Sequence, residues 1–318
     1  MNKPVIWAIG LLAGIAGGLM ALAGFAAGAL AIVLLFAAPM VIYIAALGWG
    51  PFAGFLAAAV ATAVSGYDAS LTAVVATGTL LFFPAAWGGH LANLAQPATG
   101  GQGLIWFPLS AILVRLMLAL AAGFVATGWV AGYSGDEIAD LLAATMRELA
   151  SRNPGLQTDD LPQVERSARL YASLLPLIMP ALWLILHVLV FHGAAAITRQ
   201  SKRLARPADD IAATAGLPVG ALALPLGGLA GMMMLASPLY EVATVVAGIG
   251  IAGFGLVGLA ELHRASRGRP GRGLLLFASY LMLVLFSFPL AVFAVWGAAR
   301  VLRGRSGPPP LPPVARRG

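Results

Sequence analysis

Long runs of apolar residues, separated by short polar or Pro/Gly-containing breaks, fill most of this chain. A helix needs about 20 apolar residues to cross a bilayer, because unpaired backbone groups cost several kcal/mol in hydrocarbon. The runs that meet or approach this length are 5–24, 27–47, 51–66, 71–94, 107–132, 171–198, 218–236, 239–262 and 273–302. The pattern predicts an all-α, polytopic transmembrane helical bundle with about eight or nine membrane segments.

The last run, 273–302, fits two structures. It is longer than one crossing requires, and Pro289 lies near its middle. Proline removes a helical hydrogen bond, so the run is either one strongly kinked helix or a hairpin of two short arms. A hairpin would return the basic tail to the side of the preceding arginines, and we favour it for that reason.

Residues 134–170 form the one long polar insert in this pattern. Ser134 and Glu137 have the spacing of a capping box, and a second helix is expected to start near Asp160 and run into the sixth segment. The insert is acidic, with seven carboxylates against four arginines. We expect a short extracytoplasmic helical insert that rests on lipid headgroups, with a substrate lid as the alternative.

The chain therefore divides into four parts. Residues 1–133 carry the first five transmembrane helices, 134–170 the insert, and 171–303 the C-terminal transmembrane helices. Residues 304–318 are rich in proline and arginine and are expected to form a disordered tail.

Composition strengthens the membrane interpretation. Of the 318 residues, 60% are hydrophobic and 10% are charged, and the mean hydropathy is +0.91. Soluble domains carry about 25% charged residues, so the surface of this chain is suited to lipid rather than water. The expected partner is the lipid bilayer.

The positive charge is concentrated beside the apolar runs. The chain has a net charge of +7, and most of its 19 basic residues lie in three short segments. This is the positive-inside pattern, which indicates topology, and it argues against nucleic acid as a partner. We expect a bacterial cytoplasmic (inner) membrane protein with a cytoplasmic N-terminus and a cytoplasmic tail. The segments contain Arg199, Lys202, Arg203, Arg206; Arg264, Arg267, Arg269, Arg272; and Arg300, Arg303, Arg305, Arg316, Arg317.

No enzyme motif stands out. The sequence has no cysteine, no GxSxG, no HExxH and no GxxxxGK[ST], and its only lysines are Lys3 and Lys202. We therefore expect no catalytic residue, no bound cofactor and no ATP site of the P-loop kind. An intramembrane enzyme ranks third among the functional hypotheses.

Small residues recur at four-residue spacing in the first segment, at Gly10, Gly14 and Gly18. Such spacing lets two helix backbones approach closely, which is how helices associate in lipid. Packing within the chain is the first interpretation. A docking face for a second membrane subunit is the alternative.

His187 is the clearest ionisable group at mid-segment. Ionisable groups inside lipid are costly and often functional, but a neutral imidazole is also satisfied by hydrogen bonds to a neighbouring helix. A structural role and a solute or pathway role therefore both stay open. His192 follows at a spacing of five, which places it on a different helix face, so no metal site is predicted.

Three further charged residues complete the candidates. Arg115 lies about two turns into the fifth segment and can reach back to the interface, although a pathway role remains open. Glu241 and Asp68 follow turns on the side of the insert. They are expected to be interface carboxylates, placed where a cationic or polar solute would first meet the protein.

A set of proline-, glycine- and tryptophan-containing motifs is spread over nearly the whole chain: Ala38-Pro39, Leu47 to Gly50, Pro84 to Trp87, Trp106 to Pro108, Leu175 to Pro180, Leu224-Pro225 and Pro289. With these motifs the chain resembles the YybS-like bacterial membrane proteins of unknown function, which are distantly similar to the S components of energy-coupling-factor transporters. That resemblance implies a solute-binding bundle that docks onto a permease subunit with ATPases, through small residues of its first helix. S components have fewer helices than the count expected here.

The leading hypothesis is a non-enzymatic, solute-binding component of small-molecule uptake. The alternative is a membrane scaffold or assembly protein with no transported substrate. The first predicts a solute-sized polar pocket near His187 and the outer loops. The second predicts a dry, closely packed interior.

Overall fold

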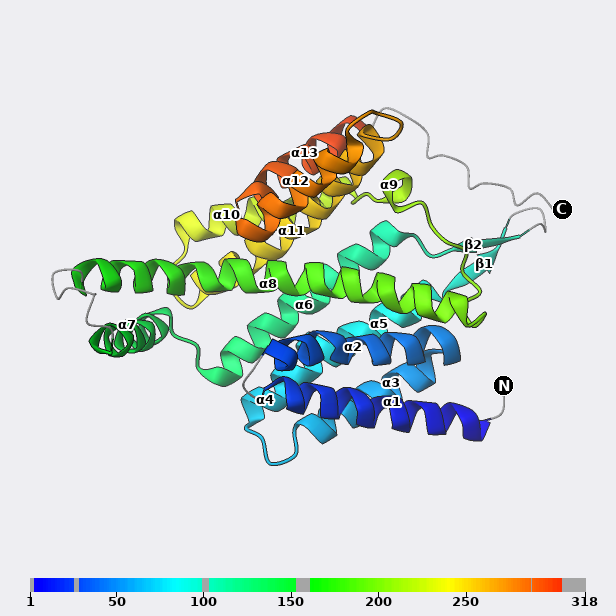
Figure 1. Ribbon diagram of the computed structural model, residues 1–318, viewed down its shortest axis with the longest axis horizontal. Helices are drawn as coiled ribbons and strands as arrows, with labels where there is room; N and C mark the ends of the chain where they lie inside the picture. The colour runs from blue at the N-terminus through cyan, green and yellow to red at the C-terminus, as the bar shows by residue number, and fades with distance from the viewer. Residues whose placement is uncertain (1–2, 26–28, 99–102, 153–160, 287, 305–318) are drawn as a thin grey trace.

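The computed structural model describes residues 3–25, 29–98, 103–152, 161–286 and 288–304. Nearly all of them are helical, as the periodicity predicts (Figure 1). The first half contains α1 (Lys3–Gly24), α2 (Ala29–Trp49), α3 (Pro51–Ser65), α4 (Leu71–Ala76), a π-helical turn (Thr77–Phe82), α5 (Phe83–Ala92) and α6 (Leu109–Ala131). The second half contains α7 (Gly135–Ser151), α8 (Leu161–Gln200), α9 (Ile211–Thr214), a 3₁₀ turn (Val219–Leu222), α10 (Ala223–Met234), α11 (Leu239–Ala265), α12 (Arg272–Leu285) and α13 (Pro289–Arg303).

The expected membrane segments are confirmed in part. Six of the described helical stretches are long and apolar enough to cross a membrane, which is compatible with a multi-pass membrane protein. The expected segments at 51–66, 218–236 and 273–302 correspond to shorter helices, so a count of eight or nine is not confirmed. The six long stretches are Lys3–Gly24, Leu30–Trp49, Leu71–Ala92, Leu109–Ala131, Glu165–Gln200 and Leu239–Ala265.

The bundle has two chemically different ends. We call the end with α7 the insert end and the opposite end, where α9 and the α11–α12 turn lie, the basic end (Figure 1). Few charges lie in the helices between the ends, and α2, α3 and α10 contain none. This distribution is what the charge pattern of the sequence predicts.

The insert is a helical hairpin. Ser134 caps α7, because its Oγ accepts a hydrogen bond from the Glu137 amide at 3.4 Å. α7 packs along the first part of α8, and an ion pair between Arg147 and Glu165 joins them. α8 then continues without a break toward the basic end, as predicted.

A short antiparallel ribbon was not predicted. β1 (Ala95–Pro97) pairs with β2 (Leu104–Trp106) at the basic end, between α5 and α6. The Pro/Gly-rich composition of this stretch indicated only a break. The pairing closes it locally through backbone hydrogen bonds.

Helix α11 is the centre of the C-terminal half. It packs against α6, α8, α10 and α13, and most of its residues are buried. The contacts are made at glycines: a Cβ added at Gly248 would lie 2.0 Å from the Leu177 carbonyl oxygen of α8, and one at Gly258 would lie 1.9 Å from the Phe293 carbonyl oxygen of α13. Small residues therefore set the backbone spacing here, as expected for helices in lipid.

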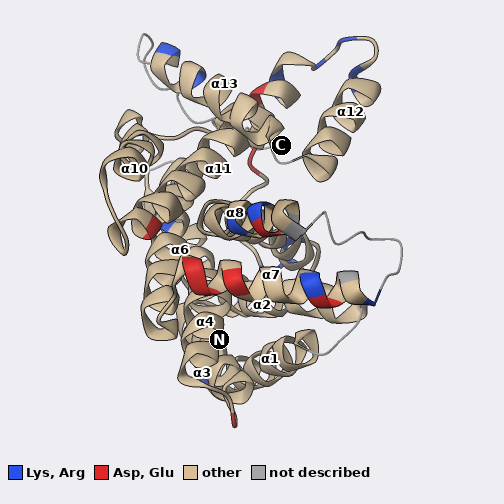
Figure 2. Ribbon diagram, turned by 90° about the vertical axis from the view of Figure 1, so that its left-hand side faces the viewer, with Lys and Arg blue, Asp and Glu red and all other residues tan. Residues whose placement is uncertain are grey.

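The run 273–302 forms two helices rather than one. α12 leads away from the basic end and ends at Leu285, and α13 begins at Pro289 and returns along α11. This is the hairpin interpretation. α12 contains no buried residue and stands apart from the bundle body (Figure 2).

Candidate functional site

His187 is fully buried and fully hydrogen-bonded. Its Nε2 lies 2.7 Å from the carbonyl oxygen of Leu80, and its Nδ1 lies 3.1 Å from the hydroxyl of Tyr43. A carbonyl can only accept, so Nε2 carries the proton. The Tyr43 hydroxyl then donates to Nδ1 of a neutral ring. Both ring nitrogens are therefore satisfied, and His187 links α8 to α2 and to the π-helical turn.

The acceptor at Leu80 exists for a reason visible in the sequence. In an α-helix this carbonyl would accept from the amide of residue 84, but residue 84 is proline and has no N–H. The chain forms a π-helical turn at Thr77–Phe82 just before it. His187 donates to the carbonyl that Pro84 leaves without its helical partner. This arrangement supports the structural interpretation of His187.

Unlike His187, Glu241 has a side-chain atom that lacks a hydrogen-bond partner among the described residues. It lies in the first turn of α11, and its Oε2 is occluded and has no hydrogen-bond partner among the described residues. The Oγ1 of Thr127 on α6 is also buried and also has no hydrogen-bond partner among the described residues. Burial, and after it the charge of Glu241, raise the pKa of Tyr133. The Tyr133 hydroxyl donates to the Ala172 carbonyl at 3.3 Å.

Glu241 and Thr127 lie at the same depth. α6 and α11 meet where a Cβ added at Gly253 would lie 2.5 Å from Cε of Met117. At a rise of 1.5 Å per residue, Thr127 lies about 15 Å from Met117 along α6, toward the insert end. Glu241 lies about 18 Å from Gly253 along α11, in the same direction. A carboxylate oxygen and a hydroxyl, neither with a hydrogen-bond partner in the described part of the chain, therefore occur at one level of the outer half.

Arg115 and Asp68 do not join this group. The guanidinium of Arg115 folds back toward the basic end, where Nη1 donates to the Ala111 carbonyl at 3.1 Å and Cζ lies 4.8 Å from the Phe107 ring centroid. That is the reach to the interface that its position predicts. Asp68 is exposed in the turn before α4, with a left-handed φ of 56°.

The glycine face of the first helix is already occupied. Gly10, Gly14 and Gly18 are buried against α3, and a Cβ added at Gly14 or Gly18 would lie 2.6 Å from the Cβ of Val60 or Val64. These glycines support packing within the chain. In this structure α3 covers the surface that a second subunit would need, and the docking interpretation stays a prediction.

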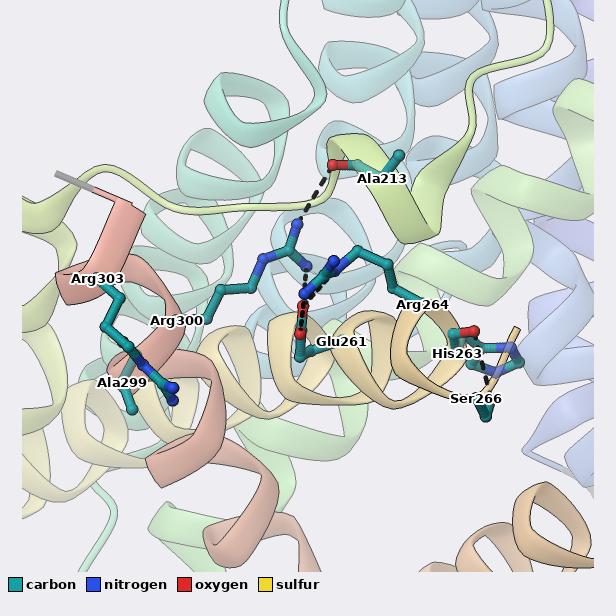
Figure 3. A network of polar contacts seen from close by, with 8 residues as sticks. All are labelled: Ala213, Glu261, His263, Arg264, Ser266, Ala299, Arg300 and Arg303. Carbon is teal, nitrogen blue, oxygen red and sulfur yellow. Dashed lines mark hydrogen bonds and ion pairs between the residues drawn. The ribbon is translucent and has the colours of Figure 1, made fainter. Parts of the chain in front are cut away.

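Sequence reasoning missed a polar network at the basic end. Glu261 of α11 is 7% exposed and accepts from Arg264 Nε at 2.8 Å, while Arg300 Nη1 of α13 lies 3.1 Å from its Oε2 (Figure 3). Arg300 Nη2 also donates to the Ala213 carbonyl at 3.2 Å. Arg300 of α13 thus contacts α11 through Glu261 and α9 through the Ala213 carbonyl. The signal was present in the sequence as a single carboxylate within a basic segment.

Arg206 is a second missed residue. It is 5% exposed, and its Nε and Nη2 donate to the two oxygens of Asp209 at 2.7 and 3.1 Å. Its Nη1 donates to the Phe107 carbonyl at 2.8 Å. A bidentate pair with an added carbonyl satisfies a buried guanidinium, so Arg206 anchors the α8–α9 connection to the start of α6.

Two hollows stand out in the described part of the chain. One, of about 50 Å³, lies near the basic end beside Phe191, His192 and Arg206, and has room for a few water molecules. The other, of about 260 Å³, is an open apolar groove between α10 and α11. Neither is lined by His187, Glu241, Asp68 or Arg115, so the solute-sized polar pocket that was expected near His187 is not found at either hollow.

No group of three or more potential metal ligands occurs within the described ranges. No family model, curated protein or solved structure matches the chain. The resemblance to the YybS-like proteins therefore remains a prediction.

Proposed function

We propose that this chain is a non-enzymatic subunit of a membrane assembly, which binds a transmembrane helix of another membrane protein on its α12–α13 hairpin. This is the scaffold or assembly hypothesis. The observation that carries it is an exposed break between two helices at the middle of the bundle's depth. The charge asymmetry between the two ends supports an inner-membrane location with both chain termini cytoplasmic.

The depth of the break follows from the packing of α13. A Cβ added at Gly255 would lie 2.6 Å from Cδ1 of Leu290, so the start of α13 lies against Gly255. α11 runs from Leu239 to Ala265, and Gly255 is close to its midpoint. The break between Phe286 and Phe288 is therefore near mid-depth, where a bilayer holds hydrocarbon and no water.

Backbone at such a break needs a polar or protein environment. The last carbonyls of α12 have no helical partner, and hydrocarbon cannot supply one. Yet the flanking side chains are open, with Val284 83% exposed, Leu285 61% and Phe288 64%. Irregular backbone at this depth is tolerated where protein covers it or a water-filled cavity lies beside it. We take the first of these, because the exposed side chains are all apolar.

The outward face of α12 has the spacing of a helix-docking surface. Leu274, Phe277, Leu281 and Val284 follow one another at intervals of three and four residues, and they are 43–83% exposed. Anchors at this spacing fit between the side chains of a neighbouring helix. We define these four residues as the α12 face.

Site-specific photo-crosslinking tests the proposal. A photoreactive phenylalanine analogue at position 277, and separately at 284, is expected to give one discrete protein adduct in native membranes, with the same partner from both positions. Leu12 on α1 is the matched control, since it is apolar and 64% exposed but lies far along the sequence from the hairpin. The control is expected to give no such adduct.

Substitutions in the α12 face test whether the crosslinked adduct depends on that face. Leu274→Ala combined with Leu281→Ala is expected to abolish the adduct from position 277 while leaving the thermal stability of the purified chain unchanged. No discrete adduct at 277 and 284 would overturn the proposal. An adduct of twice the mass of this chain would show that the partner is a second copy of the same chain. That result would also overturn the proposal of a different membrane protein as partner.

Solute binding is the second candidate, and the unpartnered Oε2 of Glu241 favours it. A cationic solute in the outer half of the bundle would supply the missing partner, with Thr127 at the same depth. Thermal unfolding with a panel of ammonium-bearing solutes is the test. A stabilising solute whose effect is lost in Glu241→Gln, and kept in Asp68→Asn, would support uptake. Equal stabilisation of both variants would contradict it.

A further inference from the structure

The basic end carries more arginine than its carboxylates can pair. Within the described ranges, the last turn of α11, the α11–α12 turn, the first turn of α12 and the last turn of α13 contribute six arginines, and two carboxylates bind among them. Arg264 and Arg300 share Glu261, and Arg267 pairs with Asp210. The six are Arg264, Arg267, Arg269, Arg272, Arg300 and Arg303.

Three of these arginines have no carboxylate. Arg269 and Arg272 are exposed and make no ion pair with any described residue. Arg303 donates from Nε to the Ala299 carbonyl of its own helix at 3.1 Å (Figure 3). The chain beyond α13 brings more arginine and no Asp or Glu. The excess positive charge at this end is therefore not neutralised by the chain itself.

The surface directly below these arginines is apolar. On α12, Leu275 and Met282 are seven residues apart and so lie on one side of the helix, next to the α12 face, and they are 46% and 42% exposed. Unneutralised arginines at the interface, with exposed apolar side chains deeper in the membrane, are complementary to an anionic lipid. Such a lipid has a negatively charged headgroup at the interface and acyl chains beneath it.

We propose that Arg269 and Arg272, at the start of α12, form a binding site for the headgroup of an anionic phospholipid, whose acyl chains lie against the exposed apolar side of α12 next to the α12 face. The guanidinium groups donate to the phosphate oxygens, in the geometry that favours arginine over lysine. Glu261 and Asp210 hold the neighbouring arginines by ion pairs, so that the headgroup meets Arg269 and Arg272. The partner-docking proposal does not depend on this site.

His263 and Tyr280 fix α12 relative to the site. The Nε2 of His263 and the hydroxyl of Tyr280 lie 2.8 Å apart, a contact between α11 and α12. This contact keeps the basic start of α12 close to the end of α11, although α12 has no buried residue.

The test is lipid binding by native mass spectrometry of the full chain in detergent, titrated with phosphatidylglycerol or with phosphatidylcholine of the same acyl chains. The wild-type chain is expected to retain phosphatidylglycerol at least tenfold better. A basic residue near an anionic surface contributes roughly fivefold, so Arg269→Gln with Arg272→Gln should remove most of this preference.

The matched control is Arg166→Gln with Arg169→Gln at the insert end. These two arginines are also exposed, are three residues apart and form no ion pair in the described ranges. The control is expected to keep the preference within about twofold. Equal retention of the two lipids by the wild type, or an equal loss in both double variants, would overturn the proposal. Displacement by millimolar inorganic phosphate alone would also overturn it, since it would identify a free-anion site.

Thermal unfolding in nanodiscs gives an independent measurement. Adding phosphatidylglycerol to a phosphatidylcholine bilayer should raise the unfolding temperature of the wild type and of the insert-end variant, and not that of the Arg269/Arg272 variant. The same rise in all three would contradict a site at these arginines.

Discussion

Helices α11 and α12 are adjacent in the sequence and similarly apolar, yet their environments are opposite. α11 is buried along most of its length, and α12 has no buried residue. The difference lies in side-chain size. Five glycines of α11 stand where a Cβ would overlap a neighbouring helix, whereas the one glycine of α12, Gly273, has nothing within 4 Å. In lipid, small residues mark the faces that contact the chain's own helices, and large apolar residues mark the faces left for lipid or partners.

The largest expected effect comes from filling a glycine contact in α11. Gly258→Ala places a methyl group 1.9 Å from the Phe293 carbonyl oxygen, and backbone cannot move aside as a side chain can. We expect a loss of about 3 kcal/mol or more in the free energy of unfolding, above the usual range for overpacking.

Gly273→Ala in α12 is the matched control, and it should leave stability unchanged or slightly raised because alanine favours the helix. Thermal unfolding of both variants in the same detergent measures the difference. Equal destabilisation would break the comparison between the two helices.

The second effect concerns the buried histidine. His187→Ala leaves the Leu80 carbonyl and the Tyr43 hydroxyl buried without their partner, so we expect a loss of about 2–4 kcal/mol. Tyr43→Phe removes one of the two bonds and should cost about 1 kcal/mol. His192→Ala, at an exposed position, should stay within about 0.5 kcal/mol. A His187→Ala chain as stable as the wild type would remove His187 from the structural core.

A third, intermediate effect is expected at the link between α11 and α13. Glu261→Gln removes the charge that Arg264 and Arg300 share, and we expect a loss of about 1–2 kcal/mol in stability. Arg300→Gln in the same background should add little, because its ionic partner is already gone. A double-mutant cycle on the unfolding free energy measures the coupling. Strict additivity would show that the pair does not hold α13.

The smallest effect is a pH dependence at the α11–α12 turn. The hydrogen bonds from Arg267 hold the pKa of the Asp210 carboxyl below its ordinary value of 3.8. A depressed carboxyl pKa stabilises the folded chain above the ordinary value, and this stabilisation is lost as the pH falls through the folded-state pKa.

Both groups of this pair are well exposed, so only a small additional loss of stability below about pH 4 is expected. Asp210→Asn should reduce the loss of stability below about pH 4, and it should leave the dependence of stability on pH unchanged near pH 7. An identical acid limb in both chains would show that the pair makes no contribution.

Much of the helical framework could be predicted from hydropathy alone. The starts of α3, α6 and α11 follow Pro- or Gly-containing breaks, and the insert hairpin follows its capping signal. The sequence could not decide whether the short helices span the membrane. The length needed to span it depends on the tilt of the helix and on the helices packed beside it, and neither can be read from hydropathy.

The candidate site was less accessible to sequence reasoning. The cost of an ionisable group in lipid identified His187 as a candidate. That its acceptor is the Leu80 carbonyl, left free by Pro84, became apparent only in the structure. What the sequence could not give was which helices meet, so neither the contact of Gly14 with α3 nor the pairing of Glu261 with Arg300 was visible. Those pairings are set by tertiary packing between distant segments.

Spin-label mobility at position 284 tests the central claim most directly. The chain has no cysteine, so Val284→Cys carries a single nitroxide, and Leu12→Cys is the reference at an exposed apolar position. The account predicts a strongly immobilised label at 284 in native membrane vesicles, released to lipid-like mobility after purification in detergent, with the label at 12 mobile in both. Lipid-like mobility at 284 in native membranes would contradict a protein cover over the α12–α13 break.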